Sequence, residues 1–296
     1  MRHEVSGLNY IDTYHRGGVY KMPLPMGIGS EAAGVVEAIG DSVTELKPGD
    51  RVTYASGTPF QPVGSYAEAR NIPAARLVKI PDGIKSETAA AMMLKGMTVS
   101  YLIKRTYKVK PGDTVVWHAA AGGVGLIACQ WLKTLGVTII GTAGSDEKCE
   151  LAKAHGADYC INYKKEDFVA RVKEITGGKG VPVVYDSVGR DTFLKSLDCL
   201  AFRGTCLLYG LSSGQVELFD PTQLSIKGCL YLSRPSTHQY HPTPELFQRS
   251  AMDVFDVIRS GAVKLHIGQR FPLQNVAEAH LALEQRRTIG ATVLIP

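Results

Sequence analysis

From residue 114 onward, short apolar runs alternate with helix-like segments, and this alternation constrains the fold more than any other feature of the chain. TVVWHA and TIIGTA are apolar along almost their whole length, and the segment VGLIACQWLKTLG separates them. Strands of this kind are buried on both faces, as happens in parallel sheets covered by helices on both sides. We therefore predict an α/β fold with a doubly wound, Rossmann-type parallel sheet over residues 91–234.

The stretch HAAAGGVGLIACQ, residues 118–130, lies between the first strand and the first helix of this region. It matches the dinucleotide fingerprint G-x-G-x-x-G except that Ala120 takes the first position. Gly122 would let the backbone approach a pyrophosphate, and Gly125 would let the helix pack closely on the strand. Ala120 fits a tight turn if its φ is negative. A turn without a ligand is the alternative, but the strand–helix units that follow favour a dinucleotide. The pyrophosphate is then expected on Gly122, Gly123 and Val124, at the helix N-terminus.

The end of the second strand indicates which dinucleotide would bind. Many such sites place an acidic residue there, where it binds the ribose 2′-hydroxyl. In TIIGTAGSDEK the strand end is small and neutral, and Lys148 follows one helical turn later. This pattern favours a 2′-phosphate and therefore NADPH, whereas Asp146 or Glu147 would favour NADH if either reached the ribose. The residues expected at this end are Thr142, Ser145, Lys148 and Tyr163.

The first ninety residues show a different pattern, in which short strand-like runs lie between glycine and proline turns. The runs that read as strands are AAGVVEAIG, KPGDRVTYA, GSYAEARNI and ARLVKIP. They predict a small β-rich lobe over residues 1–90. A helix-like segment, TAAAMMLKGMTVSYLIKRTY, follows this lobe.

The composition excludes several kinds of partner. The net charge is +5 and no run of five basic residues occurs, so neither a dedicated nucleic-acid surface nor a membrane surface is expected. There is no stretch of 18 consecutive apolar residues, and the start of the chain has no apolar segment typical of a secretory signal. The six cysteines form no C-x-x-C pair, which favours free buried thiols in a reducing, cytoplasmic compartment.

Several motifs together resemble the NADPH:quinone oxidoreductases, the zinc-free branch of the medium-chain dehydrogenase/reductase superfamily that includes zeta-crystallin. They span nearly the whole chain in the family's order: GLNYIDTYHRGGVY, GSEAAGVVEAIG, KPGDRV, LKGMTVSYL, HAAAGGVGLIACQ, INYKKEDF and VYDSVGRDTFLKSLDCL. The resemblance implies a GroES-like catalytic lobe at 1–90, to which residues 235–296 return. It also implies a homodimer that pairs the last Rossmann strand, GCLYLS, across two subunits. The family normally has further residues before GLNYID, so we expect an N-terminally shortened catalytic lobe.

The resemblance also implies that the metal site of the zinc-dependent relatives is missing. Those relatives carry a zinc-binding cysteine where this chain has Asn9, and a Gly-His-Glu triplet where it has Gly29-Ser30-Glu31. Asparagine and serine are not among the usual zinc ligands. We therefore expect no metal, and we expect hydrogen-bond donors to stabilise the oxyanion that develops on the substrate.

The resemblance assigns the candidate catalytic residues to one segment. Asn9 would face the nicotinamide, Tyr14 and Tyr20 would line the substrate cleft, and Asp12 would order their loop. Simple packing is the alternative for each tyrosine.

Further residues are expected around the cofactor. Lys95 and Thr98 would sit where the lobes meet, near the nicotinamide ribose, with a helix-capping or solvated Lys95 as the alternative. Arg286 would reach the cofactor from the closing segment LEQRRTIGA. The nicotinamide half is expected against Ser187 and the loop of Tyr209, Gly210, Leu211, Ser212 and Ser213.

Three functions follow from this resemblance. The first is reduction of quinones by hydride transfer from NADPH, in which the cofactor carries the hydride and the protein supplies position and charge. The second is reduction of α,β-unsaturated aldehydes or ketones, which needs the same hydride geometry. The third is a non-catalytic NADPH-binding protein with a crystallin-like or RNA-binding role, for which the sequence shows no aromatic–basic RNA motif.

Overall fold

The computed structural model describes residues 1–55 and 64–296, which form two compact units. Unit 1 contains residues 1–100 and 237–296, and unit 2 contains residues 101–236. Helix α2 (Ser86–Tyr101) runs without a break through residue 91, where the sequence placed a boundary. The units therefore divide near the end of this helix, about ten residues later than the expected limit.

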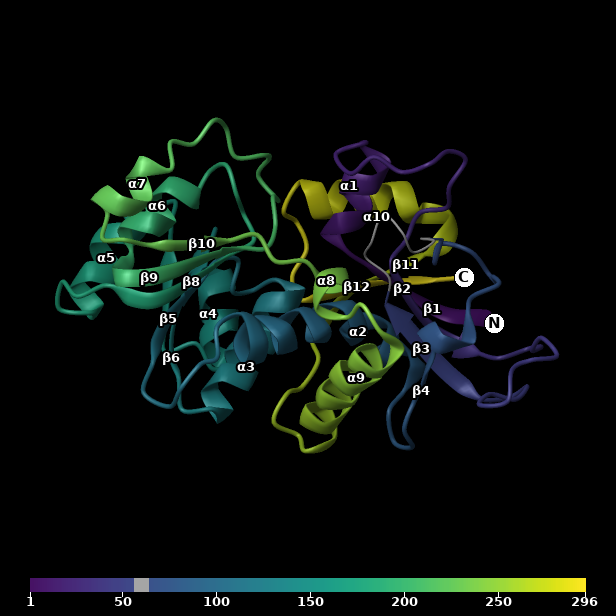
Figure 1. Ribbon diagram of the computed structural model, residues 1–296. Helices are drawn as coiled ribbons and strands as arrows, with labels where there is room; N and C mark the ends of the chain where they lie inside the picture. Colours follow the sequence, from purple (N-terminus) through teal and green to yellow (C-terminus); the bar gives the residue numbers. More distant parts are fainter. Residues whose placement is uncertain (56–63) are drawn as a thin grey trace. The chain divides into compact units, whose positions relative to one another are not determined.

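Unit 2 contains a six-stranded parallel sheet in the order β10-β9-β8-β5-β6-β7 (Figure 1). Its strands are β5 (Thr114–Trp117), β6 (Thr138–Ala143), β7 (Tyr159–Asn162), β8 (Val181–Asp186), β9 (Leu200–Leu208) and β10 (Tyr231–Ser233). The strand order reverses next to β5, because β6 pairs on one side of it and β8 on the other. This arrangement confirms the predicted doubly wound sheet, in which ligands bind beyond the carboxyl ends of the strands where the order reverses.

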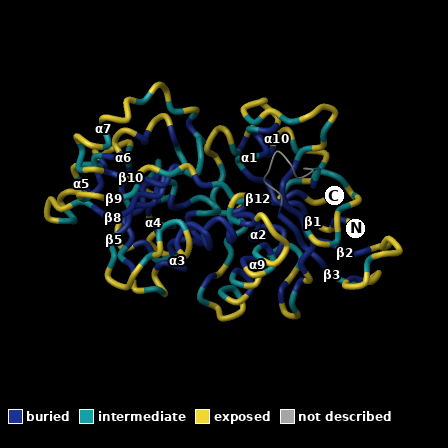
Figure 2. Tube along the Cα trace, viewed as in Figure 1, coloured by how far each residue is buried: buried dark blue, intermediate teal, exposed yellow. Residues whose placement is uncertain are grey.

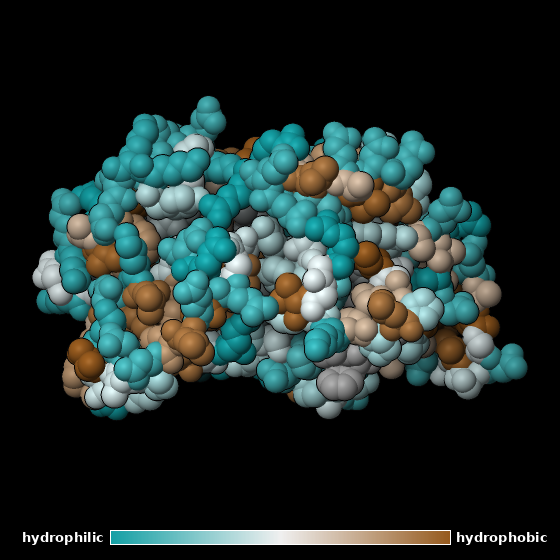
Figure 3. All heavy atoms as spheres, turned by 90° about the horizontal axis from the view of Figure 1, so that it is seen from above, coloured by the Kyte–Doolittle hydropathy of each residue, from teal (hydrophilic) through white to brown (hydrophobic). Residues whose placement is uncertain are grey.

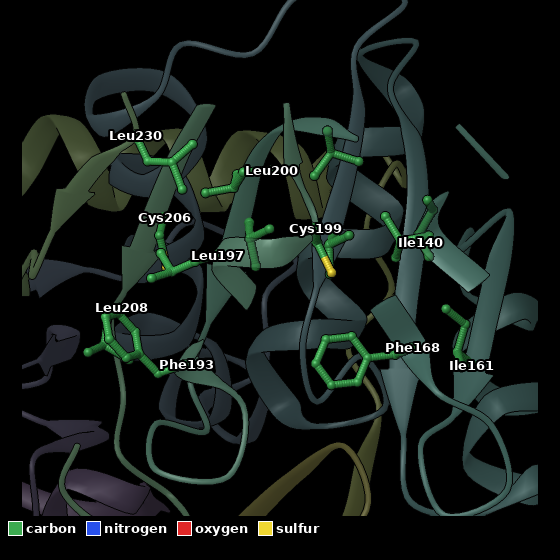
Figure 4. Packing of buried hydrophobic residues seen from close by; sticks show 14 residues of the cluster. Ile140, Ile161, Phe168, Phe193, Leu197, Cys199, Leu200, Cys206, Leu208 and Leu230 are labelled. Carbon is green, nitrogen blue, oxygen red and sulfur yellow. The ribbon is translucent and has the colours of Figure 1, made fainter. Parts of the chain in front are cut away.

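Helices cover both faces of this sheet. They are α3 (Gly123–Thr134), α4 (Asp146–Ala154), α5 (Phe168–Ile175), α6 (Phe193–Asp198) and α7 (Thr222–Ile226), preceded by a π-helical turn, η2 (Leu102–Thr106). On one face, α5 and α6 bury Phe168, Phe193 and Leu197 against apolar strand residues (Figure 4). Cys199 and Cys206 belong to the same apolar cluster, and they are free thiols as expected. Two cysteines depart from the expected burial, because Cys229 is exposed and Cys160 is only partly buried.

Unit 1 contains a second six-stranded sheet, in the order β11-β12-β1-β2-β3-β4. Its strands are β1 (Arg2–Leu8), β2 (Glu31–Val35), β3 (Arg51–Ala55), β4 (Val78–Lys79), β11 (Ile267–Pro272) and β12 (Ala291–Ile295). One sequence expectation was wrong here, and one strand was missed. The segment GSYAEARNI is not a strand, since it forms only an isolated bridge between Ala69 and Arg2. Strand β1 was not predicted, although it is central to the sheet.

The helices of unit 1 come from both ends of the chain. They are α1 (Tyr10–Arg16), α2, α8 (Thr237–Tyr240), α9 (Pro244–Arg259) and α10 (Val276–Glu284), with the short turns η1 (Ala74–Arg76) and η3 (Leu273–Asn275). The inner strands of both sheets and most of α2 are buried, whereas the edge strands β10 and β11 are largely exposed or half-buried (Figure 2). On the face drawn in Figure 3, hydrophobic residues form separate patches among hydrophilic ones. No helix within 1–55 or 64–296 has the length and apolar character needed to cross a bilayer.

Candidate functional site

The glycine loop connects β5 to α3, as the sequence predicted. Gly122 is the N-cap of α3, with φ −79° and ψ 171°. A Cβ atom on Gly125 would lie 2.4 Å from the carbonyl oxygen of Ala119 and 2.5 Å from that of Ala120, so only glycine lets the helix approach the loop this closely. Ala119 takes the left-handed conformation with φ 55°, whereas Ala120 is not among the residues with positive φ. The alanine in the first fingerprint position is therefore tolerated as expected.

The loop has the geometry that a pyrophosphate needs. A Cβ atom on Gly122 would meet the carbonyl oxygen of Ala119 at a tight 3.2 Å and no other atom within 4 Å, so this glycine keeps the start of α3 close to the loop without a side chain in front of it. The first N–H groups of a helix have no partner within the helix and attract anions. Gly123 and Val124 supply such N–H groups in the first turn of α3, and both residues are partly exposed. The predicted residues thus fit a dinucleotide pyrophosphate.

A cavity of about 330 Å³ lies at the ends of β6 and β7, the expected position of the adenosine ribose. Ser145 caps α4 by accepting a hydrogen bond from the backbone N–H of Lys148 at 3.3 Å, which leaves its own hydroxyl hydrogen available. A Cβ atom on Gly144 would lie 2.6 Å from the Tyr163 hydroxyl oxygen, so this glycine makes room for the tyrosine. The cavity is lined by Gly144, Ser145, Asp146, Glu147, Asn162, Lys164 and Lys165.

Asp146 is engaged by two neighbours. Asn162 donates a hydrogen bond to its Oδ1 at 2.7 Å, and the ammonium group of Lys165 forms an ion pair with its Oδ2. Lys165 and Asn162 together lower the pKa of this carboxyl group. Both carboxylate oxygens therefore already have donors from the protein.

Thr142 lies at the end of β6, but its side chain belongs to a buried polar network. Its hydroxyl lies 2.9 Å from Nδ1 of His118, whose Nε2 lies 2.9 Å from the hydroxyl of Ser196. Ser196 donates in turn to Asp186 at 2.8 Å. Burial lowers the pKa of His118, and the nearby Asp186 only partly opposes that effect. The network links the carboxyl ends of β5, β6 and β8 beneath the glycine loop.

The loop after β9 lies next to the end of β8. A Cβ atom on Gly210 would lie 2.6 Å from the carbonyl oxygen of Ser187, and the backbone N–H of Ser212 donates to that oxygen at 3.1 Å. The Ser213 hydroxyl donates to the carbonyl of Val188 at 2.8 Å. The expected nicotinamide-side residues Ser187, Tyr209, Gly210, Leu211, Ser212 and Ser213 are therefore neighbours.

In unit 1, three charged or polar residues form a buried cluster. The Lys95 ammonium forms an ion pair with Oε1 of Glu31 at 2.6 Å and donates to Oδ1 of Asn9 at 2.9 Å. The Asn9 amide donates to the same Glu31 oxygen at 2.8 Å. The Lys95 side chain is 6% exposed and that of Glu31 is 0% exposed, so Lys95 is not solvated. An ammonium can only donate, so the Asn9 oxygen must face Lys95 and its NH₂ group must face Glu31.

Asp12 lies beside this cluster with a hydrogen-bond shell of its own. It accepts from the backbone N–H of Asn9 at 2.9 Å, from Ser30 at 2.5 Å and from the Tyr66 hydroxyl at 2.8 Å. Burial raises the pKa of Asp12 to about 6, although these donors act in the opposite direction. Asp12 thus ties the start of α1 to the residues around it, and this supports its expected role in ordering the loop.

Tyr14 and Tyr20 lie together at the partly exposed end of the α1 segment. Their rings meet edge to face, with centroids 5.5 Å apart. Thr98 is buried and donates to the carbonyl of Leu94 within its own helix, at 2.8 Å. Arg286 is exposed in the turn after α10, with φ 58°. The unit division places these four residues in unit 1, whereas the glycine loop lies in unit 2.

Sequence reasoning overlooked several residues of these sites. Glu31 was mentioned only as part of the Gly29-Ser30-Glu31 triplet, yet it forms the ion pair with Lys95 and accepts a hydrogen bond from Asn9. The motif INYKKEDF contains three further residues that line the cavity, Asn162, Lys164 and Lys165. Its two adjacent lysines, which follow a strand end, could have indicated an anion site. Across the described parts of the chain, no group of three His, Cys, Asp or Glu side chains is placed to hold a metal ion.

A GroES-like unit joined to a Rossmann-type unit defines the medium-chain dehydrogenase class. The alcohol dehydrogenase GroES-like domain matches residues 1–82, and the zinc-binding dehydrogenase family matches residues 123–248.

Individual relatives place the chain within this class. A quinone oxidoreductase from Pseudomonas aeruginosa is 51% identical over 100% of this chain and 90% of its own length. A 2-haloacrylate reductase from a Burkholderia species is 42% identical over the same shares. The crystal structure of Escherichia coli quinone oxidoreductase complexed with NADPH has a TM-score of 0.96 at 47% identity, covering 100% of this chain and 90% of that one. The chain belongs to the quinone oxidoreductase family of the medium-chain dehydrogenases/reductases.

Proposed function

We propose that this protein reduces quinones with NADPH by hydride transfer, without a bound metal. The observation that carries the proposal is a glycine loop shaped for a pyrophosphate in a chain that matches an NADPH-complexed quinone oxidoreductase at a TM-score of 0.96. In the overall reaction, NADPH gives a hydride to the quinone and the solvent gives a proton, which yields NADP⁺ and the hydroquinone. The protein's part is to bind, orient and stabilise charge.

Unit 2 would bind the cofactor. The N–H groups at the start of α3 would hold the pyrophosphate, and the Ser145 hydroxyl, Lys148 and Tyr163 would hold the 2′-phosphate. The nicotinamide half would lie against the ends of β8 and β9. The residues proposed in unit 2 are Ala120, Gly122, Gly123, Val124, Thr142, Ser145, Lys148, Tyr163, Ser187, Tyr209, Gly210, Leu211, Ser212 and Ser213.

Unit 1 would supply the groups that act on the substrate. Tyr14 and Tyr20 are the proposed donors to the substrate oxygen, since their paired rings are partly exposed. Asn9 would face the nicotinamide, and Lys95 and Glu31 hold its amide in one orientation. Thr98 and Arg286 are the remaining proposed cofactor contacts from this unit.

A second candidate function is reduction of α,β-unsaturated carbonyl compounds. The 42% identity to a 2-haloacrylate reductase favours it, because that protein's name gives an activated alkene as its substrate. Delivery of a hydride to an alkene carbon or to a quinone needs the same cofactor geometry, and the hydrogen-bond donors would stabilise an oxyanion in both reactions.

The two functions are separated by NADPH oxidation measured with a panel of quinones and a panel of enones and haloacrylates. We expect turnover with quinones at a higher kcat/KM than with any alkene. A higher kcat/KM for an alkene would favour the second function. NADPH binding without turnover on either panel would contradict both functions and indicate a non-catalytic NADPH-binding protein.

We also propose that the protein is a cytoplasmic homodimer assembled through β10. This strand is the edge of the parallel sheet, and an unpaired edge is a place where chains associate. Large apolar side chains lie exposed on or near it: Phe202, Ile226, Tyr231 and Leu232. We call these four residues the edge patch. Pairing β10 with its copy would bury this patch in a symmetric interface.

A further inference from the structure

The adenosine-end cavity contains two adjacent lysines that have different partners. Lys165 forms an ion pair with Asp146, whereas Lys164 forms none with a residue in the described ranges. Both lysines are exposed and both line the cavity. One ammonium is therefore available to an anionic ligand and the other is already engaged by a carboxylate.

Asp146 supplies a carboxylate to the lining of this cavity. It occupies the first turn of α4, after the end of β6, where a carboxylate can accept from a ribose 2′-hydroxyl. A free carboxylate at this position would favour NADH and would repel a 2′-phosphate. Here Asn162 donates to one carboxylate oxygen and Lys165 to the other, so a ribose hydroxyl would compete with two donors from the protein, and the charge of the acid is paired.

Asn162 fixes the position of Asp146 and of the turn that follows β7. It is the last residue of β7, pairs with Ala143 of β6 and is 7% exposed. Its Nδ2 donates to Asp146, while its Oδ1 accepts from the backbone N–H of Lys164 at 3.1 Å. Its carbonyl also accepts from the backbone N–H of Lys165 at 2.9 Å. One buried amide thus orients the acid and the turn that carries both lysines.

We propose that Asn162 and Lys165 are specificity-determining residues, which favour NADPH over NADH by masking the carboxylate of Asp146. Lys164 differs from them because its ammonium is available to the 2′-phosphate itself. The inference rests on the proposed function, since it assumes that the dinucleotide binds along the ends of β5, β6 and β7. It assigns Lys165 an indirect role that depends on Asp146.

A double-mutant cycle tests this dependence. NADPH and NADH are titrated against wild type, Lys165→Gln, Asp146→Asn and the double variant, with Lys164→Gln and Lys164→Gln/Asp146→Asn as the matched neighbouring pair. We expect Lys165→Gln to weaken NADPH binding about fivefold, the upper range for an exposed ion pair. In the Asp146→Asn background the same change should alter the Kd less than twofold. Lys164→Gln should weaken NADPH binding equally in both backgrounds, and the NADH affinity should not fall in any Lys165 variant.

Three results would count against the inference. Equal losses from Lys165→Gln with and without Asp146 would show that Lys165 touches the phosphate directly. An unchanged NADPH affinity in Lys165→Gln would show that the ion pair has no effect on specificity. Either result overturns the masking role alone and leaves the proposed function intact. A wild-type protein that binds neither nucleotide would overturn the proposed function and the inference together.

Discussion

Burial raises the pKa of Asp12, whereas the hydrogen bonds that it accepts lower it. Burial raises its pKa to about 6, so the folded protein holds this proton more tightly than the unfolded chain does. Stability that depends on such a group is present at low pH and is lost as the pH rises through the interval between the unfolded and folded pKa values. The free energy of unfolding of wild type, measured relative to Asp12→Asn, should fall by about 2 kcal/mol between pH 4 and pH 7. Urea unfolding of both proteins at several pH values measures this difference in the free energy of unfolding. A stability of wild type that rises with pH relative to Asp12→Asn would contradict the prediction.

The Lys95–Glu31 pair gives a second prediction for a single residue. Lys95→Met would leave the Glu31 carboxylate buried without its cation, which typically costs about 3–5 kcal/mol of the free energy of unfolding. The double variant Glu31→Gln/Lys95→Met removes both charges and should be more stable than Lys95→Met alone. Urea unfolding of the three proteins compares them. Equal stability of the single and double variants would show that the ion pair does not matter in the folded state.

Residue types could be predicted in these clusters, but their partners could not. Asn9 and Lys95 belong to recognisable motifs, whereas their contacts with Glu31 join residues 22 and 64 positions apart. A Cβ atom on Gly7 would lie 2.3 Å from Oε1 of Glu31, so the cluster also needs a glycine on β1. Such contacts depend on how three elements pack together in space. A local sequence pattern does not contain that information, so the contacts could not be predicted.

At the scale of elements, the two functional glycines of the loop should respond differently to alanine. The Cβ atom of Gly125→Ala would lie 2.4 Å from a backbone oxygen, so α3 must move and the protein should lose more than about 1 kcal/mol of stability. Gly122→Ala meets its nearest atom at 3.2 Å and should keep near-normal stability while NADPH binding weakens about tenfold. Thermal unfolding and NADPH titration separate the two effects. Normal NADPH affinity in Gly122→Ala would contradict the pyrophosphate site.

The elements of unit 2 could be predicted better than those of unit 1. Each strand of the parallel sheet is a short apolar run followed by a helix, so local pattern and tertiary environment agree. Strand β1 escaped prediction because RHEVSGL mixes polar and small residues, and its pairing with β2 and β12 comes from opposite ends of the chain. GSYAEARNI has an alternating pattern but no strand partner beyond one bridge.

For the whole molecule, the edge patch predicts the oligomeric state. Wild type should have the mass of a dimer at micromolar concentration, and Tyr231→Glu should shift it toward the monomer, because a charge on β10 opposes pairing of two edges. Leu281→Glu is the matched control, since Leu281 is 53% exposed on α10 in the other unit and should leave the dimer unchanged. Sedimentation velocity measures all three proteins. A monomeric wild type would rule out the proposed assembly.

The most direct test of the account is turnover by metal-stripped protein. After exhaustive chelation, NADPH oxidation and hydroquinone formation are followed together under anaerobic conditions, and zinc is quantified in the same sample. We predict an unchanged rate, one NADPH oxidised for each quinone reduced, and no stoichiometric zinc, because Asn9 and Ser30 offer hydrogen-bonding groups and neither is a usual zinc ligand. Loss of turnover on chelation that zinc restores, or no NADPH oxidation with any quinone, would contradict it.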